Sequence, residues 1–223
     1  MDKKKLLFAL FIIVSLLYII GILLDNLIIR FTFKPLIMLA LMMYYSSSVK
    51  YKNNVYLAAL FFSFFGDTML LYESETSFMI GLISFLIAHV LFIIMVVRML
   101  SKSEFKLKIA SSIPFIISYG GLLFLLKDNL SDMFLPVAVY GFVISIFGSV
   151  SVLNYLSSRN KEGLYLMVGS ILFVISDSIL AINKFNQSQE YYPIIIITTY
   201  ILAQYLICQF AIIKTEQRKS AVI

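Results

Sequence analysis

The chain of 223 residues is 61% hydrophobic and only 13% charged, with a mean hydropathy of +0.96 and a net charge of +6. A soluble domain is about half apolar and about a quarter charged, so this composition excludes a soluble globular protein and indicates a single integral membrane domain over residues 1–223. The positive charge follows membrane topology, and we therefore expect no nucleic-acid partner.

Apolar runs separated by short polar breaks predict an all-α fold, a polytopic membrane bundle of eight transmembrane helices. A membrane span needs about 20 mostly apolar residues. The first run follows a basic start, as in a signal peptide, but it is too long for one and should be retained. The expected helices, in chain order, are 6–24, 33–46, 54–72, 78–99, 109–126, 134–156, 164–182 and 193–213.

The distribution of Lys and Arg predicts the orientation of these helices, because cytoplasmic segments are enriched in both. If the N-terminus is cytoplasmic, only 4 of the 18 basic residues fall in outer segments, namely Arg30, Lys34, Lys127 and Lys184. We therefore expect a multi-pass cell-membrane protein with both termini in the cytoplasm. The inner residues are Lys3, Lys4, Lys5, Lys50, Lys52, Arg98, Lys102, Lys106, Lys108, Arg159, Lys161, Lys214, Arg218 and Lys219.

Two carboxylates lie inside the expected spans. Asp67 interrupts the run FFSFFGDTMLLYE, and Asp177 interrupts the run LFVISDSILA. Each lies 13 residues after the expected start of its helix, or about 20 Å at about 1.5 Å per residue, so we expect the two at equal depth. His89 and Gln204 each lie 11 residues into the following helix. GDTML (66–70) also resembles SDSIL (176–180), which suggests a 4+4 repeat with parallel halves.

This pair of carboxylates is a candidate acid–base site. Burying a carboxylate in hydrocarbon is costly, so each must face the bundle interior or water. Two neighbouring carboxylates cannot both ionise cheaply, and one neutral acid beside one ionised base is what acid–base hydrolysis needs. The alternative is structural, with each carboxylate accepting hydrogen bonds that fix helix packing. We favour the functional interpretation of Asp67 and Asp177, because they are expected at equal depth.

Four further polar residues are candidates for substrate binding. His89 either completes the site or makes a hydrogen bond between helices. A metal held by His89 and both aspartates is an alternative, but no closely spaced pair of ligands supports it, so we expect no metal and no cofactor. Tyr200 and Gln204 are four residues apart and share a helix face, where they orient a ligand or join helices. Lys34 either snorkels to the interface or contacts a phosphate.

Five segments, in order along the chain, resemble the YhhN-type lysoplasmalogenase family. They are FKPLIML (33–39), SFFGDTMLL (63–71), FMIGLISFLIAHVLF (78–92), GSILFVISDSILA (169–181) and YILAQYLI (200–207). The resemblance implies hydrolysis of the vinyl ether bond of a lysophospholipid, a lysoplasmalogen, to a fatty aldehyde and a glycerophospho-alcohol. The two acidic positions of the family match Asp67 and Asp177.

Acid–base chemistry and the resemblance agree with each other. A vinyl ether hydrolyses after protonation of its β-carbon, and an oxocarbenium ion then captures water; one aspartate can supply the proton and the other can stabilise the cation. The resemblance leaves the head group open, and another lysolipid or ether remains an alternative substrate. The competing class is a proton-coupled or small-molecule transporter that uses the same aspartates, for which discontinuous helices would be typical.

Overall fold

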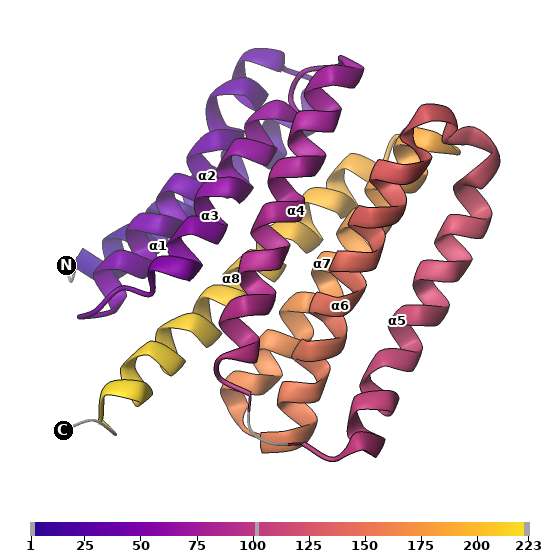
Figure 1. Cartoon of the computed structure of the whole chain (residues 1–223). Helices are drawn as coiled ribbons and strands as arrows, with labels where there is room; N and C mark the ends of the chain where they lie inside the picture. Colours follow the sequence, from indigo (N-terminus) through magenta and orange to yellow (C-terminus); the bar gives the residue numbers. More distant parts are fainter. Residues whose placement is uncertain (1–2, 101–102, 221–223) are drawn as a thin grey trace. The chain divides into compact units, whose positions relative to one another are not determined.

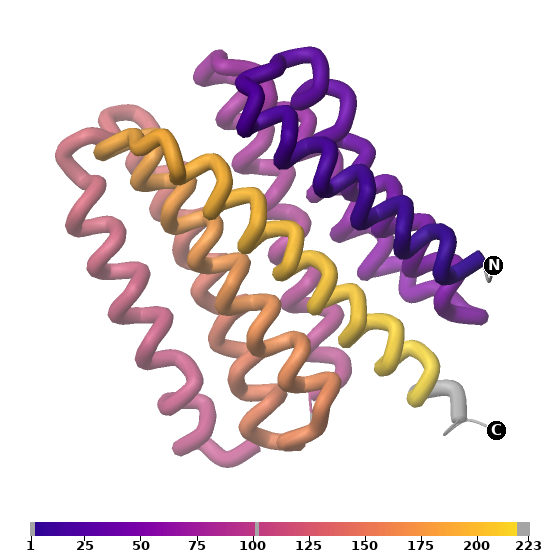
Figure 2. Tube along the Cα trace, turned by 180° about the vertical axis from the view of Figure 1, so that it is seen from behind, coloured from indigo at the N-terminus to yellow at the C-terminus, as the bar shows by residue number. Residues whose placement is uncertain are grey.

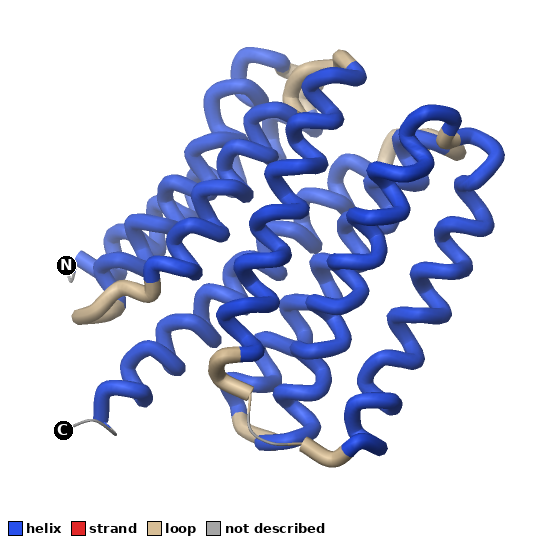
Figure 3. The backbone as a smooth tube through the Cα atoms, in the orientation of Figure 1, coloured by secondary structure: helices blue, strands red, loops and turns tan. Residues whose placement is uncertain are grey.

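The structure, a computed structural model, describes residues 3–100 and 103–220, and this part of the chain forms eight α-helices and two single-turn 3-10 helices (Figure 1). Figure 3 shows only helices and loops over the same residues. The predicted all-α class and the number of helices are confirmed. Lys102, which was assigned to an inner segment, lies outside the described residues, as do the side chains of Arg218 and Lys219. The helices are α1 (Lys3–Leu23), α2 (Leu27–Ser48), α3 (Asn54–Met69), α4 (Glu75–Val97), α5 (Phe105–Leu126), η1 (Lys127–Asn129), η2 (Ser131–Met133), α6 (Phe134–Ser158), α7 (Lys161–Phe185) and α8 (Tyr192–Ser220).

Seven of the eight α-helices in the described part are long and apolar enough to cross a membrane, as expected of a multi-pass membrane protein. The exception is α3, whose 16 residues reach about 24 Å against a hydrocarbon core of about 30 Å. Its predicted end at residue 72 is wrong by three residues. After Leu70 the amides of Leu71 and Tyr72 bond three residues back, to Thr68 and Met69, so the apolar run continues as a tight turn.

Asparagine caps explain why two helices start before their apolar runs. Asn26 accepts a hydrogen bond from the amide of Ile29, and α2 therefore begins at Leu27, six residues before the predicted start. Asn160 accepts from the amide of Gly163, and α7 begins at Lys161, three residues early. A capped first turn tolerates polar residues, which the apolar runs did not include.

By its internal packing the chain divides into two compact units, and each is described by itself. The first is formed by the described residues up to 91 and from 208 on, and the second by residues 92–207. α4 and α8 are continuous helices that contribute residues to both units. The prediction of one membrane domain stays a prediction.

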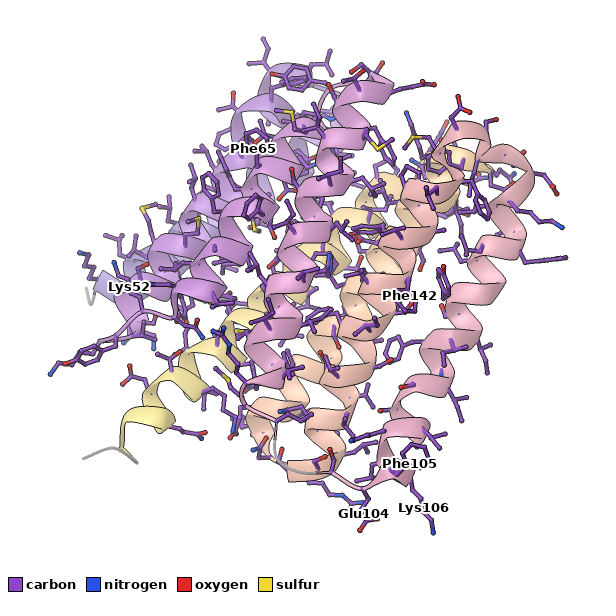
Figure 4. All side chains as sticks on the ribbon, viewed as in Figure 1. Lys52, Phe65, Glu104, Phe105, Lys106 and Phe142 are labelled. Carbon is purple, nitrogen blue, oxygen red and sulfur yellow. The ribbon has the colours of Figure 1, made fainter. Side chains whose placement is uncertain are left out.

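In the first unit, α2 packs between α1 and α3, and α1 and α2 lie side by side in Figure 1 and Figure 2. The end of α8 is fastened to the α2–α3 connection, where Lys52 is labelled in Figure 4. Tyr45 and Thr215 share a hydrogen bond of 3.2 Å between their hydroxyls, and the amide of Lys50 donates to Glu216. The core is apolar and aromatic, with Phe11, Ile37, Leu41, Tyr45, Tyr56 and Leu60 all buried.

In the second unit, α6 packs between α5 and α7. A Cβ at Gly148 of α6 would lie 2.3 Å from the ring of Phe115 on α5, so these helices approach closely. Phe142 lies on the side of α6 that faces α5 (Figure 4), with its ring centroid 6.2 Å from that of Tyr119. α7 packs against α8 at Gly169, where a Cβ would lie 3.1 Å from the carbonyl of Ala203.

In the second unit, basic residues predicted to be cytoplasmic lie at one end and basic residues predicted to be outer lie at the other. The start of α5, where Glu104, Phe105 and Lys106 are labelled in Figure 4, lies at the same end of this unit as the α6–α7 turn that carries Arg159. Lys127, in η1, and Lys184, in the last turn of α7, lie at its opposite end. A hydrogen bond of 3.4 Å from Asn129 to Asn186 joins the chain segments there.

We expect topology reporters to place residue 77 outside the cell and residue 160 inside. The basic residues then fall mainly on the cytoplasmic side, and the short helix α3 must still cross the bilayer. Fusions truncated after Ser77 and after Asn160, each carrying a reporter active on one side only, measure this. The reverse pattern, with residue 77 inside and residue 160 outside, would contradict eight crossing helices with cytoplasmic termini, because it follows either from outer termini or from an α3 that does not cross.

Candidate active site

Asp67 lies in the last turn of α3, where α3 and α4 are in close contact. Its side chain is only 3% exposed. The preceding residue, Gly66, faces α4, and a Cβ there would lie 2.6 Å from the ring of Phe85. Gly81 on α4 faces Leu70 in the same way, at 3.1 Å. The missing side chains of both glycines therefore let the two helices approach each other next to Asp67.

His89 is buried on α4, one turn after Phe85. Its Nδ1 lies 2.8 Å from the backbone carbonyl oxygen of Phe85. Because a carbonyl only accepts hydrogen bonds, Nδ1 carries the proton and donates it, and Nε2 of the neutral ring is then an acceptor. His89 is thereby held in one tautomer and can accept a hydrogen bond from a ligand hydroxyl.

Asp177 lies on α7 and is half-buried. Its Oδ2 accepts a hydrogen bond from the hydroxyl of Tyr140 on α6. Next to it, the hydroxyl of Ser176 donates to the carbonyl of Ile196 on α8 at 2.9 Å. The carboxylate is therefore oriented by α6, while its neighbour in sequence joins α7 to α8.

Sequence analysis missed Tyr140. It stands in the apolar run VAVYGF of α6, 37 residues before Asp177. A tyrosine inside a span requires a hydrogen-bond partner for its hydroxyl, and this requirement is the one feature of the sequence that could have marked Tyr140. The sequence around Tyr140 does not predict which residue is the partner, because the pairing depends on how α6 and α7 are rotated against each other.

Tyr200 and Gln204 are both buried on α8 and are brought together as predicted. Nε2 of Gln204 donates to the hydroxyl of Tyr200 at 3.3 Å. The ring of Tyr200 packs edge-on against Phe173 of α7, with centroids 5.3 Å apart. These two side chains belong to the same unit as Asp177 and Tyr140.

The α3–α4 pair of the first unit and the α7–α8 pair of the second have the same register. Gly66 lies close to positions 81 and 85 of α4. A shift of 110 positions carries Gly66 to Ser176, and a shift of 115 positions carries Gly81 to Ile196. The hydroxyl of Ser176 donates a hydrogen bond to the backbone carbonyl of Ile196. The same shift of 115 carries Phe85 to Tyr200 and His89 to Gln204.

The counts along the helices differ from those predicted. Asp67 lies 13 residues after Asn54, the first residue of α3, but Asp177 lies 16 residues after Lys161, the first residue of α7. The predicted equal count is therefore wrong by three residues, about 4.5 Å along a helix, and the equal depth of the two carboxylates stays a prediction. The cause is the Asn160 cap, which starts α7 early.

The predicted site residues fall into two sets. Asp67, His89 and Lys34 belong to the first unit, and the other three belong to the second. Lys34 is half-buried on α2, with its Nζ 6.0 Å from the ring centroid of Tyr18. Within the described part of the chain, no group of three or more His, Cys, Asp and Glu residues could hold a metal ion. The prediction that the site uses no metal stays a prediction.

Replacing Gly66 by alanine is expected to lower the free energy of unfolding by about 1–3 kcal/mol, the usual cost of overpacking. The new methyl group would meet the ring of Phe85 at 2.6 Å, and a buried ring cannot move aside without displacing its neighbours. Thermal unfolding in detergent micelles measures the change. Gly120→Ala is the matched control, since a Cβ at that position would have nothing within 4 Å apart from its chain neighbours and the backbone of its own helix. Equal stability of the two variants would contradict the close α3–α4 contact.

The fold and these side chains define the class, a multi-pass, all-helical membrane protein with carboxylates inside its helices. The YhhN family matches residues 29–210, and the chain belongs to this family, which confirms the resemblance. It is 25% identical over 171 residues to lysoplasmalogenase TMEM86A of Bos taurus; the match covers 70% of this chain and 65% of that relative, slightly less than two thirds of its length. No solved structure matches the chain.

Proposed function

We propose that the protein is a membrane hydrolase of the lysoplasmalogenase type, which cleaves the vinyl ether bond of a lysophospholipid. The observation that carries this proposal is the presence of two carboxylates, Asp67 and Asp177, on helices inside the region that matches the YhhN family. A relative with a matching sequence is named a lysoplasmalogenase. Carboxylates at membrane depth suit a substrate whose reactive bond lies among acyl chains.

The proposed reaction needs one proton donor and one charged group. A neutral Asp67 gives its proton to the β-carbon of the vinyl ether, and a C–H bond forms as the double bond becomes an oxocarbenium ion. Water adds to the cationic carbon and loses a proton to Asp177. The hemiacetal then breaks its bond to the glycerol oxygen, which takes the proton from Asp177 and leaves as the alcohol. The hemiacetal hydroxyl gives its proton to Asp67 and becomes the carbonyl of the aldehyde, so both carboxyl groups return to their starting states. The sum is one water consumed per bond cleaved.

Tyr140 supports this division of roles. A carboxylate that accepts a hydrogen bond from a hydroxyl is better stabilised when charged than one without such a donor. We therefore propose Asp177, which Tyr140 contacts, as the carboxylate that faces the cation, and Asp67 as the proton donor. Tyr140 is then a positioning residue, because it acts through Asp177.

The remaining predicted residues are proposed to hold the substrate. Nε2 of His89, held as an acceptor by the bond of Nδ1 to Phe85, suits the free hydroxyl that a lysolipid carries on its glycerol. Tyr200 and Gln204 present a bonded pair of polar groups on one face of α8. The equal register of the two helix pairs supports the proposal that the halves are a parallel repeat and that Asp67 and Asp177 are equivalent positions in it.

Each of the eight described helices is continuous, including α2 and α5 with their internal prolines, whereas the transport alternative expects broken helices at the site. We therefore keep the hydrolase as the single candidate. We also propose that both termini lie in the cytoplasm, because the Lys and Arg residues fall mainly in the segments that this orientation places inside.

The experiment that tests the function is aldehyde release by the purified protein from a lysolipid panel. The panel contains 1-alkenyl, 1-alkyl and 1-acyl lysolipids with choline and ethanolamine head groups. We expect aldehyde from the 1-alkenyl lysolipids alone, because only a vinyl ether gives an oxocarbenium ion on protonation. No aldehyde from either 1-alkenyl lysolipid would refute the proposal, and proton flux in reconstituted vesicles would then favour a carrier.

A further inference from the structure

Two cations, Arg30 and Lys34, lie on the face of α2 that packs inside the first unit. The buried residues Ile37, Leu41 and Tyr45 follow each other along this face at helical spacing. Three and four residues are the steps that keep side chains on one face of a helix, and steps of three and four back from Ile37 give Lys34 and Arg30. The opposite face of α2 carries apolar residues that are exposed, such as Ile28 and Met43.

Neither cation has a strong counter-charge in the described part of the chain. Arg30 pairs with Asp25 at 3.6 Å, and the Asp25 side chain is 93% exposed. An exposed pair of this kind contributes about 0–1 kcal/mol. Nε of Arg30 is buried and has no hydrogen-bond partner among the described residues. The Nζ of Lys34 faces the ring of Tyr18 at 6.0 Å, so both cations retain hydrogen-bond donors for a ligand.

Membrane topology does not explain the pair. Only four of the basic residues fall in segments predicted to be outer, and two of the four are Arg30 and Lys34. They are four residues apart on one helix, where like charges repel. Snorkelling explains a lysine on the lipid face of a helix, but these two residues continue the buried face.

We propose that Arg30 and Lys34 bind the phosphate group of the lysolipid, and this proposal rests on the proposed function. Guanidinium and ammonium groups donate charge-assisted hydrogen bonds to phosphate oxygens. The two residues lie three and seven positions after Leu27, the first residue of α2, about 4.5 and 10.5 Å along the helix. They therefore lie near the end of a span, where a head group meets the hydrocarbon.

The test compares two substrates that share the vinyl ether but differ in the phosphate. One is a 1-alkenyl lysophosphatidylethanolamine, and the other is the phosphate-free 1-alkenylglycerol. Arg30→Gln and Lys34→Gln are each expected to raise KM for the phosphorylated substrate about 10- to 100-fold, the usual loss of a hydrogen bond to a charged group. The KM for 1-alkenylglycerol should change far less. Lys184→Gln is the matched control, since Lys184 is also predicted to be outer but lies in the last turn of α7.

Further arms separate this proposal from its alternatives. Lys34→Arg keeps the charge and should recover most of the loss. Binding of a non-hydrolysable 1-alkyl lysophosphatidylethanolamine, measured without turnover, should weaken in the two glutamine variants. If inorganic phosphate competes as strongly as the lipid, the pair is a site for free phosphate and the proposal is overturned. The proposal is also overturned if the glutamine variants change KM equally for both substrates or change it for neither. A protein that releases no aldehyde but still binds the lysolipid through these residues contradicts only the proposed function.

Discussion

Asp67→Asn and Asp177→Asn are each expected to lower kcat for vinyl ether hydrolysis by about 10²–10⁴-fold, the usual contribution of a general acid or base. Asparagine keeps the size of the side chain and most of its hydrogen bonding, but it can neither give up a proton in the reaction nor carry a negative charge. The fold should survive, because a neutral amide is less costly to bury than a carboxylate. Aldehyde release by purified variants measures the loss, and membrane insertion and thermal unfolding serve as checks of folding.

The double variant sharpens this prediction. Groups that act in one reaction are strongly non-additive, so the variant with both changes should be about as slow as the slower single variant. Asp128→Asn, in the short helix η1 between α5 and α6, is the control and should keep full activity. Chelators should have no effect on a two-aspartate site. Full activity of Asp177→Asn at normal expression would contradict the hydrolase mechanism.

Tyr140→Phe is expected to lower kcat about 10- to 100-fold with KM within about threefold, because Asp177 loses the donor that orients and stabilises its charge. Since a purely structural defect would lower the amount of folded enzyme and leave the kcat of the folded fraction unchanged, the measurement is kcat per folded protein. Tyr119→Phe is the matched control. Tyr119 lies on α5, and its hydroxyl donates a hydrogen bond of 3.1 Å to the backbone carbonyl of Ala138 on α6, the helix that also carries Tyr140. An equal fall in kcat for both variants would show that the loss is not specific to Asp177.

Helix boundaries show where the sequence was insufficient even at the local level. The apolar runs predicted all eight helices, but the starts of α2 and α7 depended on Asn26 and Asn160 as caps. The end of α3 depended on a change to hydrogen bonds between residues three apart after Leu70. Caps and tight turns are backbone events, and an average of hydropathy over a run of residues does not detect them.

The candidate site was found in part from the sequence, because a carboxylate in an apolar run is conspicuous by composition alone. Asp67 and Asp177 are visible in this way, and His89 as well. Arg30 was assigned only to an outer segment, since its place on the buried face of α2 becomes evident once Ile37 and Leu41 are known to be buried. Tyr140 was missed for the reason that tyrosine is common in apolar helices and its partner lies on another helix.

The sequence by itself determined the class of protein and the number of its helices, because both follow from the free energy of transferring each segment into hydrocarbon, a sum over neighbouring residues. Only the tertiary structure decided which side chains meet. The contact of Gly66 with Phe85 and the bond from Tyr140 to Asp177 depend on the rotation and the axial shift of packed helices. These two variables depend on how the surfaces of helices from distant parts of the chain fit together, so the sequence of a single helix does not determine them.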